Sequence, residues 1–259
     1  MKTAVVTGAS GGIGLETARA LLADGWQVVC LSRHACPLEG VRSIPCDITD
    51  STQVQAAFAA VDRVDLLVNN AGFGISGAVE CTGEAEMRRQ FDLNFFAWVT
   101  VIQAALPALR ESRGRILNIS SAAAVFSIPF QSFYSATKAA VESLTCALRS
   151  ELAPFGITVG ALRLGDVKTG FTAARQKSGS GDDLYAGRIA CSVAVMEHDE
   201  QNGMPPAAIA AAVVRAAHKK RLPPVTTVGI KYKLLCGLNK LLPLSAVTAL
   251  VAKIYIPEK

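Results

Sequence analysis

The stretch TAVVTGASGGIG, residues 3–14, decides the fold because it joins a short apolar strand to a glycine-rich turn. A helical pattern follows the turn, so strand, turn and helix stand in the order of a nucleotide-binding βα unit. Glycines at such a junction let a pyrophosphate approach the free N–H groups of the helix N-terminus. Taken alone, the turn also fits a plain tight loop. The predicted cofactor contacts in it are Gly8, Ser10, Gly12, Ile13 and Gly14.

Short apolar runs alternate with helical patterns along most of the chain, which is typical of parallel βαβ units. Strands are expected near 3–7, 26–32, 42–46, 64–69, 114–120, 157–164 and 225–228, and helices near 12–24, 50–60, 84–110 (broken around Asn94), 132–154 and 205–218. The sequence therefore predicts an α/β fold, a single-domain Rossmann doubly wound parallel sheet of about seven strands. Within 1–259 we expect a nucleotide-binding and catalytic core over 1–165, a substrate loop over 166–204, and a C-terminal helix and apolar tail over 205–259.

Composition narrows the function classes. The 259 residues are 51% hydrophobic and 18% charged, with a net charge of +5, which fits a globular core and excludes a disordered chain. Basic residues are scattered, and the short cluster at 219–221 fits a helix C-terminus, so we expect no nucleic-acid partner. Seven cysteines form no CxxC pair and no metal-binding spacing, which predicts reduced thiols, a cytoplasmic location and no metal. The first strand leaves no room for a signal peptide.

The second strand indicates the cofactor. NAD-binding enzymes usually end this strand with an acid that binds the ribose hydroxyls, whereas this strand ends with Ser32 and Arg33. A guanidinium can bind a 2′-phosphate bidentately, so we expect NADP, with NADPH favoured over NADH. A surface arginine beside bound NAD is the alternative. Asp47 and Ile48 end the third strand, where the carboxylate can bind the adenine amino group or simply close a turn.

Tyr134 and Lys138 lie four residues apart, on one face of the expected helix 132–154. A lysine ammonium close to a tyrosine favours the phenolate and lowers the pKa of the phenol, which suits proton transfer to a carbonyl oxygen. Ser121, at the end of the fifth strand, can donate a hydrogen bond to the same oxygen. Asn94, at the break of the long helix, can hold a water that supplies protons to Lys138. Each residue alone also fits a structural role.

With these motifs in this order, residues 3 to about 170 resemble the short-chain dehydrogenase/reductase family. The resemblance implies a catalytic tetrad of Asn94, Ser121, Tyr134 and Lys138, with Tyr134 and Lys138 also contacting the cofactor. It adds further cofactor contacts at Asn70, Ala71, Gly72, Gly165, Val167 and Thr169. Leu164 stands where the family usually has proline. The C-terminal sequence resembles hydroxysteroid and retinol dehydrogenases, and such relatives usually form homodimers or homotetramers.

The resemblance places the substrate between Tyr134 and the segment 166–204, whose irregular Gly/Ser-rich sequence is typical of a lid or binding loop. The expected lining is apolar with few fixed charges, which favours a bulky ketone or alcohol such as a steroid, bile acid or retinoid. It consists of Phe73, 122–126, Phe130, Phe133 and Phe171. A reductase of small or acyl ketones and an NADP-binding sensor without turnover are the alternatives.

The tail carries a leucine stripe at helical spacing, with three lysines beside it. The stripe consists of Leu234, Leu235, Leu238, Leu241 and Leu242. A core or dimer face is the favoured interpretation. An interfacial helix on a membrane surface is the second.

Overall fold

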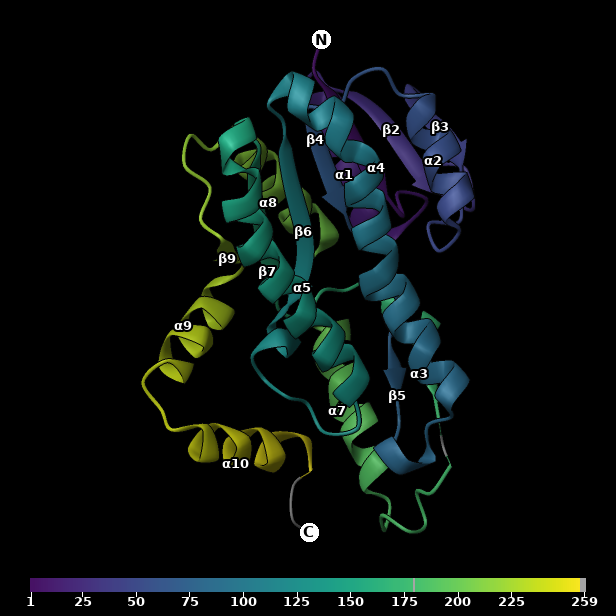
Figure 1. Cartoon of the computed structure of the whole chain (residues 1–259). Coiled ribbons are helices and arrows are strands. Elements are labelled where there is room, and N and C mark those ends of the chain that lie inside the picture. The colour runs from purple at the N-terminus through teal and green to yellow at the C-terminus, as the bar shows by residue number, and fades with distance from the viewer. Residues whose placement is uncertain (179, 257–259) are drawn as a thin grey trace.

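The computed structural model describes residues 1–178 and 180–256, and its centre is a parallel sheet of seven strands (Figure 1). The strand order is β3-β2-β1-β4-β6-β7-β9, which confirms the predicted doubly wound sheet. These strands are β1 (Thr3–Thr7), β2 (Gln27–Ser32), β3 (Val41–Pro45), β4 (Leu66–Asn69), β6 (Arg115–Ser121), β7 (Thr158–Leu164) and β9 (Val225–Thr227). Two short strands, β5 (Ile75–Ser76) and β8 (Gln176–Lys177), pair separately.

Helices cover both faces of the sheet (Figure 1), which explains why its central strands are almost wholly buried and mostly apolar. One layer contains α1 (Gly12–Ala23) and α8 (Pro206–His218), which pack against each other. The other contains α2 (Ser51–Ala59), α4 (Ala97–Ser112) and α5 (Ser132–Leu152). All residues of β1 and β4 are buried. The chain reverses its winding direction between these two strands, which is where open α/β sheets bind ligands.

The long helix breaks where the sequence predicts. α3 (Glu84–Phe91) continues through a π-helical turn over Asp92–Phe96 into α4. Over Glu84–Ser112 this continuous helix is long and apolar enough to cross a membrane by length and composition. Its buried side chains, including Trp98 and Leu109, belong to the hydrophobic core under the sheet, so we interpret it as a core helix.

The segment 166–204 is more regular than predicted. It contains α6 (Phe171–Ala174) and the 14-residue helix α7 (Arg188–Gln201), so its interpretation as wholly irregular was wrong. Ile189, Val193 and Met196 of α7 form a small second core, against which Phe130 packs. This packing holds the segment on the body of the protein.

The apolar tail folds as two helices, α9 (Ile230–Asn239) and α10 (Leu244–Tyr255), at the edge of the molecule (Figure 1). The favoured interpretation of the leucine stripe was a core or dimer face, and its core half was wrong, because Leu234 and Leu241 are 69% and 81% exposed; the dimer face stays a prediction. The stripe does not lie on one helix, because α9 ends at Asn239. Leu241 and Leu242 lie in the connection between α9 and α10.

Candidate active site

The glycine turn has a backbone that only glycine adopts readily. Gly8 and Gly12 have φ values of 69° and 55°, in the left-handed region. A Cβ on Gly14 would lie 2.3 Å from the Gly8 carbonyl oxygen, so α1 can begin directly behind β1 only if this residue has no side chain. Gly11, at the N-cap, receives no side-chain cap, which leaves the first N–H groups of α1 free for an anion.

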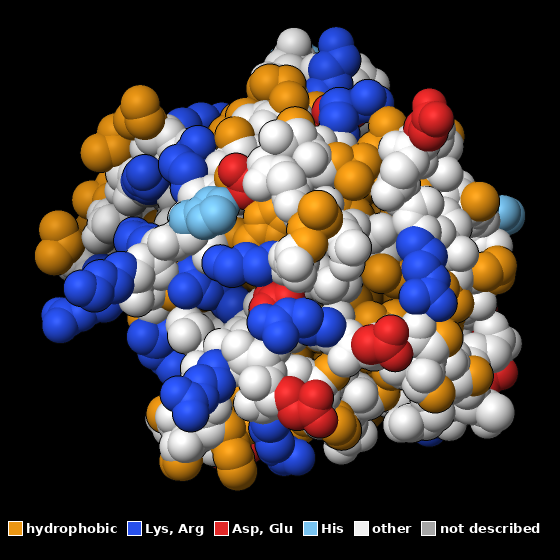
Figure 2. All heavy atoms as spheres, turned by 90° about the horizontal axis from the view of Figure 1, so that it is seen from above, with side chains coloured by type: hydrophobic (Ala, Val, Ile, Leu, Met, Phe, Trp, Pro, Cys, Tyr) orange, Lys and Arg blue, Asp and Glu red, His pale blue; other side chains and the backbone are white. Residues whose placement is uncertain are grey.

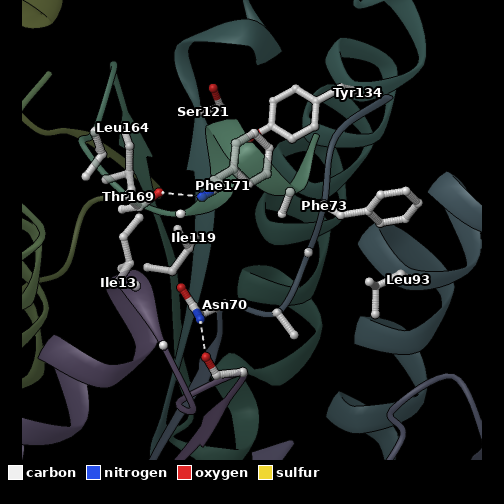
Figure 3. Close-up of a pocket in the computed structure, with 18 of the residues that line it drawn as sticks. Ile13, Asn70, Phe73, Leu93, Ile119, Ser121, Tyr134, Leu164, Thr169 and Phe171 are labelled. Carbon is white, nitrogen blue, oxygen red and sulfur yellow. Dashed lines mark hydrogen bonds between the residues drawn. The ribbon is translucent and has the colours of Figure 1, made fainter. Parts of the chain in front are cut away.

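Asn70 holds this turn from the neighbouring strand. Its side-chain nitrogen donates to the carbonyl oxygen of Thr7 at 2.9 Å, while its backbone N–H donates to the Thr7 hydroxyl at 2.9 Å. The same side-chain nitrogen also donates to the carbonyl oxygen of Gly8 at 3.4 Å (Figure 3). The next carbonyl, that of Ala71, accepts a hydrogen bond from the Trp98 indole at 2.8 Å. The segment after β4 is therefore fixed on both sides, which gives the predicted phosphate cradle a rigid wall.

Two polar residues mark the ends of β2 and β3. Arg33 follows β2 and is exposed. Hydrogen bonds from Thr49 lower the pKa of the Asp47 carboxyl, and the charge of Arg33 adds to this effect. The Thr49 hydroxyl donates to Asp47 Oδ1 at 2.7 Å, so part of the carboxylate closes a turn. Arg33 and Asp47 line the same cavity as the glycine turn.

Asn94 lies in the π-helical turn and is fully buried. Its Nδ2 donates to the carbonyl oxygen of Phe73 at 2.9 Å, and its Oδ1 accepts from the N–H of Phe73 at 3.1 Å. A Cβ on Gly72 would lie 3.0 Å from Asn94 Oδ1. Asn94 therefore fixes the segment after β4 to the helix layer. The sequence predicted that Asn94 holds a water, and it did not predict this contact.

Lys138 is buried beneath the site. Its Nζ donates to the carbonyl oxygen of Ile119 at 2.9 Å and lies 4.5 Å from the centre of the Trp98 ring. Burial lowers the pKa of Lys138 to about 7, although the charge of Glu142 opposes the shift. At neutral pH the amine thus exchanges a proton readily, because its pKa is close to the ambient pH.

Burial raises the pKa of Tyr134 to about 12, while interaction with Ser121 lowers it. This differs from the expectation that Lys138 lowers the pKa of Tyr134: burial is the largest cause of the shift, and an amine with a pKa of about 7 is neutral at the high pH where the buried phenol loses its proton. Tyr134 is therefore held as the neutral phenol, the form that can give a proton. Its ring lies 5.6 Å from that of Phe171, with Ser121 close by (Figure 3).

The segment after β7 forms the opposite wall. The Thr169 hydroxyl accepts a hydrogen bond from the N–H of Phe171 at 3.1 Å, which turns the Phe171 ring towards Tyr134 (Figure 3). The Tyr232 hydroxyl of α9 donates to Asp166, and burial raises the pKa of that carboxyl. Gly165 is needed here, because its missing side chain leaves the space that the Tyr232 ring occupies.

One cavity of about 820 Å³ joins these parts. Its wall includes every predicted catalytic and cofactor residue except Gly14 and Asn94, and these two contact wall residues, Gly8 and Phe73 respectively. Of the predicted substrate lining, Phe73, Ala123 and Phe171 reach the cavity. Phe130 and Phe133 do not: Phe130 packs on Tyr185, and Phe133 lines a separate hollow. The remaining residues of 122–126 also lie outside the wall.

Sequence reasoning missed several wall residues that come from other parts of the chain. Apolar ones are Leu93, Ile119, Ile128, Met196 and Tyr255, and charged ones are Arg89 and Glu200. Leu93 adjoins Asn94, which is a signal in the sequence. Nothing local distinguishes Met196 or Tyr255 from any other apolar helix residue.

These features can be compared with known proteins. A family model described as short chain dehydrogenase matches residues 2–179. The chain belongs to the short-chain dehydrogenase/reductase family. It is therefore an oxidoreductase that acts on alcohol and keto groups with a nicotinamide cofactor.

Two relatives and one solved structure illustrate the match. A 3-ketodihydrosphingosine reductase of Bacteroides thetaiotaomicron is 40% identical over 245 residues, 91% of each chain. Human 17-beta-hydroxysteroid dehydrogenase type 1 is 34% identical over 187 residues, 64% of this chain and 57% of that protein. A short-chain dehydrogenase of Streptomyces avermitilis superposes with a TM-score of 0.83 at 33% identity, covering 97% of this chain and 95% of that one.

Proposed function

We propose that this protein is an NADPH-dependent reductase of a bulky, apolar ketone. The observation that carries the proposal is one continuous cavity that runs from Arg33 at the end of β2, past the glycine turn, to Tyr134 and an apolar end. A steroid, bile acid or retinoid fits this end. A long-chain ketone such as 3-ketodihydrosphingosine fits it as well, and the reductase of that name among the relatives supports this class.

Three charged residues of the cavity wall, Glu200, Asp166 and Arg89, are engaged by other side chains, which supports an apolar substrate. Glu200 pairs with Arg175 and accepts a hydrogen bond from the Thr172 hydroxyl at 2.7 Å. Asp166 accepts a hydrogen bond from the Tyr232 hydroxyl. Arg89 donates to Gln176 and lies over the Phe73 ring. A ketone with little polarity beyond its carbonyl would therefore meet few unsatisfied charges.

Different residues of the cavity would carry out different steps of the ketone reduction. The nicotinamide, when bound, supplies the hydride. Tyr134 gives its phenolic proton to the ketone oxygen, and the Ser121 hydroxyl donates a hydrogen bond that polarises the same oxygen. Lys138 holds the ribose hydroxyls and, with a pKa of about 7, can return a proton to Tyr134 at neutral pH. The free N–H groups of α1 bind the pyrophosphate.

The preference for NADPH rests on Arg33. No acid stands at the end of β2 to bind a ribose 2′-hydroxyl, and the exposed guanidinium at this edge can bind a 2′-phosphate. The seven free thiols support a reducing, cytoplasmic setting. A homo-oligomer is also part of the proposal, because a hollow lined by Phe96 and Phe133 opens on the outer side of the helices that carry Asn94 and Tyr134.

The proposal is tested by mixing the pure protein with NADPH or NADH and panels of steroid, bile-acid, retinal, long-chain and small hydrophilic ketones. We expect NADPH-dependent turnover of a bulky ketone, reduced about 10²- to 10⁴-fold by Tyr134→Phe through loss of the proton donor. In Arg33→Gln, we expect the KM for NADPH to rise about tenfold or more and that for NADH to stay unchanged.

Three results would contradict the proposal. Turnover of small hydrophilic ketones alone would exclude the substrate class. Equal KM values for NADPH in wild type and Arg33→Gln would exclude the assigned role of Arg33. Tight NADPH binding with no turnover of any ketone would favour a cofactor-sensing protein.

A further inference from the structure

The helices α9 and α10 present a continuous set of large apolar side chains to solvent. Ile230, Leu241 and Leu244 are each 78% exposed or more. Monomeric proteins rarely leave an apolar patch of this extent uncovered, so such a patch marks a contact surface. The exposed apolar residues of this tail surface are Ile230, Leu234, Leu235, Leu238, Leu241, Leu242, Leu244, Leu250 and Ile254.

The charge of the same segment has one sign. Residues 230–256, which contain α9 and α10, have four lysines and no aspartate or glutamate, although the whole chain has 26 basic and 21 acidic residues. Lys231, Lys233, Lys240 and Lys253 are exposed between the apolar residues. Along the left edge of Figure 2, on the side where α9 lies in Figure 1, blue and orange side chains alternate.

We propose that the tail surface docks the protein on an anionic lipid bilayer. Leucines in the connection and on the outer faces of α9 and α10 would enter the boundary between headgroups and acyl chains. The lysine ammonium groups would bind lipid phosphates, while the apolar stems of the lysines extend along the leucines that have entered the bilayer. Neither helix needs to cross the membrane for this contact.

A second copy of the chain fits the tail surface less well than a bilayer does. In an isologous dimer the same patch faces itself, so each lysine would approach the lysines of the partner. No acid within 201–256 is present to compensate the repulsion. An anionic surface satisfies both the apolar and the cationic side chains at once.

The tail surface is joined to the active-site cavity. Tyr255, at the end of α10, forms part of the cavity wall, and α10 packs on α7, which contributes Met196 and Glu200 to the same wall. Tyr232 connects α9 to the wall residue Asp166. Docking would therefore bring the cavity wall beside the bilayer, and an apolar ketone could pass from the bilayer into the cavity. This access step rests on the proposed function, whereas docking does not.

Flotation of the full-length protein with vesicles tests the docking directly and requires no substrate. The vesicles contain phosphatidylcholine alone or phosphatidylcholine with phosphatidylglycerol. We expect wild type to float with the anionic vesicles and to lose binding as salt rises. The combined variant Leu234→Glu, Leu241→Glu, Leu244→Glu should remain unbound. Leu184→Glu is the matched control, because Leu184 is 71% exposed on the loop before α7 and should leave flotation unchanged.

Charge is tested with the combined variant Lys231→Gln, Lys233→Gln, Lys240→Gln, which should weaken binding to anionic vesicles about 100-fold, since each lysine near such a surface contributes about fivefold. Thermal melting checks that each variant is folded. If the triple leucine variant does not fold, Leu241→Glu alone replaces it, because Leu241 lies between the two helices and is 81% exposed.

Wild type that stays unbound to anionic vesicles would overturn the proposal. Equal loss of flotation in Leu184→Glu would also overturn it, because the contact would then not belong to the tail. If wild type forms an oligomer that the leucine substitutions dissociate, and vesicles do not bind, the tail surface is an interface between copies of this chain. A protein that floats as expected but reduces no ketone would contradict only the proposed function.

Discussion

The glycine turn depends on residues without a side chain, because neighbouring atoms occupy the space that a Cβ would need. In Gly14→Ala the new methyl group would lie 2.3 Å from the Gly8 carbonyl oxygen and 2.6 Å from Asn70 Nδ2. Both neighbours belong to backbone-anchored parts of the turn, so α1 or the turn must shift. We expect Gly14→Ala to lower the free energy of unfolding by about 1–3 kcal/mol.

Gly11→Ala is the matched control for this prediction. Gly11 adopts extended backbone, with a φ of −167°, and a Cβ there would have no neighbour within 4 Å. Urea unfolding of the cofactor-free protein measures both variants. Equal losses of stability would mean that the close contact at Gly14 does not limit the turn.

The buried amine of Lys138 predicts a dependence of stability on pH. Its pKa is about 7 in the folded protein, lowered from 10.5 by burial. Between these values the unfolded chain holds a proton that the folded protein has released, so the contribution of Lys138 to the free energy of unfolding becomes more favourable as pH rises. Below pH 7 both states are protonated, and the buried charge has its full cost.

Lys138→Met removes this titration and keeps most of the side chain's apolar length. We expect the stability of wild type relative to Lys138→Met to increase from about pH 7 towards pH 10. Chemical denaturation of both proteins across this range measures the difference. A difference that stays constant with pH would contradict the burial of Lys138 as an amine with a lowered pKa.

At the scale of secondary-structure elements, the sheet and its covering helices were predictable because each has a strong periodic signal. β1, the glycine turn and α1 follow one another within a short stretch, and the βαβ alternation repeats the pattern. The break at Asn94 was expected from its place in the long helix. Its contacts with the Phe73 backbone were not, because they join segments 21 residues apart.

Helix α7 was missed although its buried residues Ile189, Ser192, Val193 and Met196 have helical spacing. A polar serine occupies one of the inward positions, and the helix follows a Gly/Ser-rich stretch with Gly187 at its N-cap. Both features weaken the signal of an amphipathic helix. Its packing against residues near Phe130 supplies the stabilisation that the local sequence does not indicate.

Apolar side chains at the correct spacing do not reveal what covers them. Phe133 is the residue next to Tyr134 in α5, yet it lines the outer hollow and not the cavity. The leucines of α9 form an equally clear stripe and are exposed. Which face of a helix meets the core depends on how the whole chain packs, and single-sequence patterns do not contain that information.

On the scale of the whole molecule, a rigid sheet and a peripheral tail meet at the cavity. The central strands β1, β4, β6 and β7 are almost wholly buried, whereas α9 and α10 bury only Cys236, Val247 and Val251. Figure 1 places the two helices away from the sheet, with their contact to the body made through β9 and α7. Local opening costs least where few apolar contacts are lost.

Hydrogen exchange should therefore divide the protein into two parts. We expect the amides of β1 and β4 to exchange most slowly and those of α9 and α10 much faster, because opening the tail exposes little additional apolar surface. Adding anionic vesicles should slow exchange in α9 and α10 and leave β1 and β4 unchanged, whereas neutral vesicles should have little effect. Mass spectrometry of peptic fragments measures both parts in one experiment. If the tail is as protected as β4 before vesicles are added, another copy of the chain already covers it, since within the described residues 1–178 and 180–256 the two tail helices bury only Cys236, Val247 and Val251.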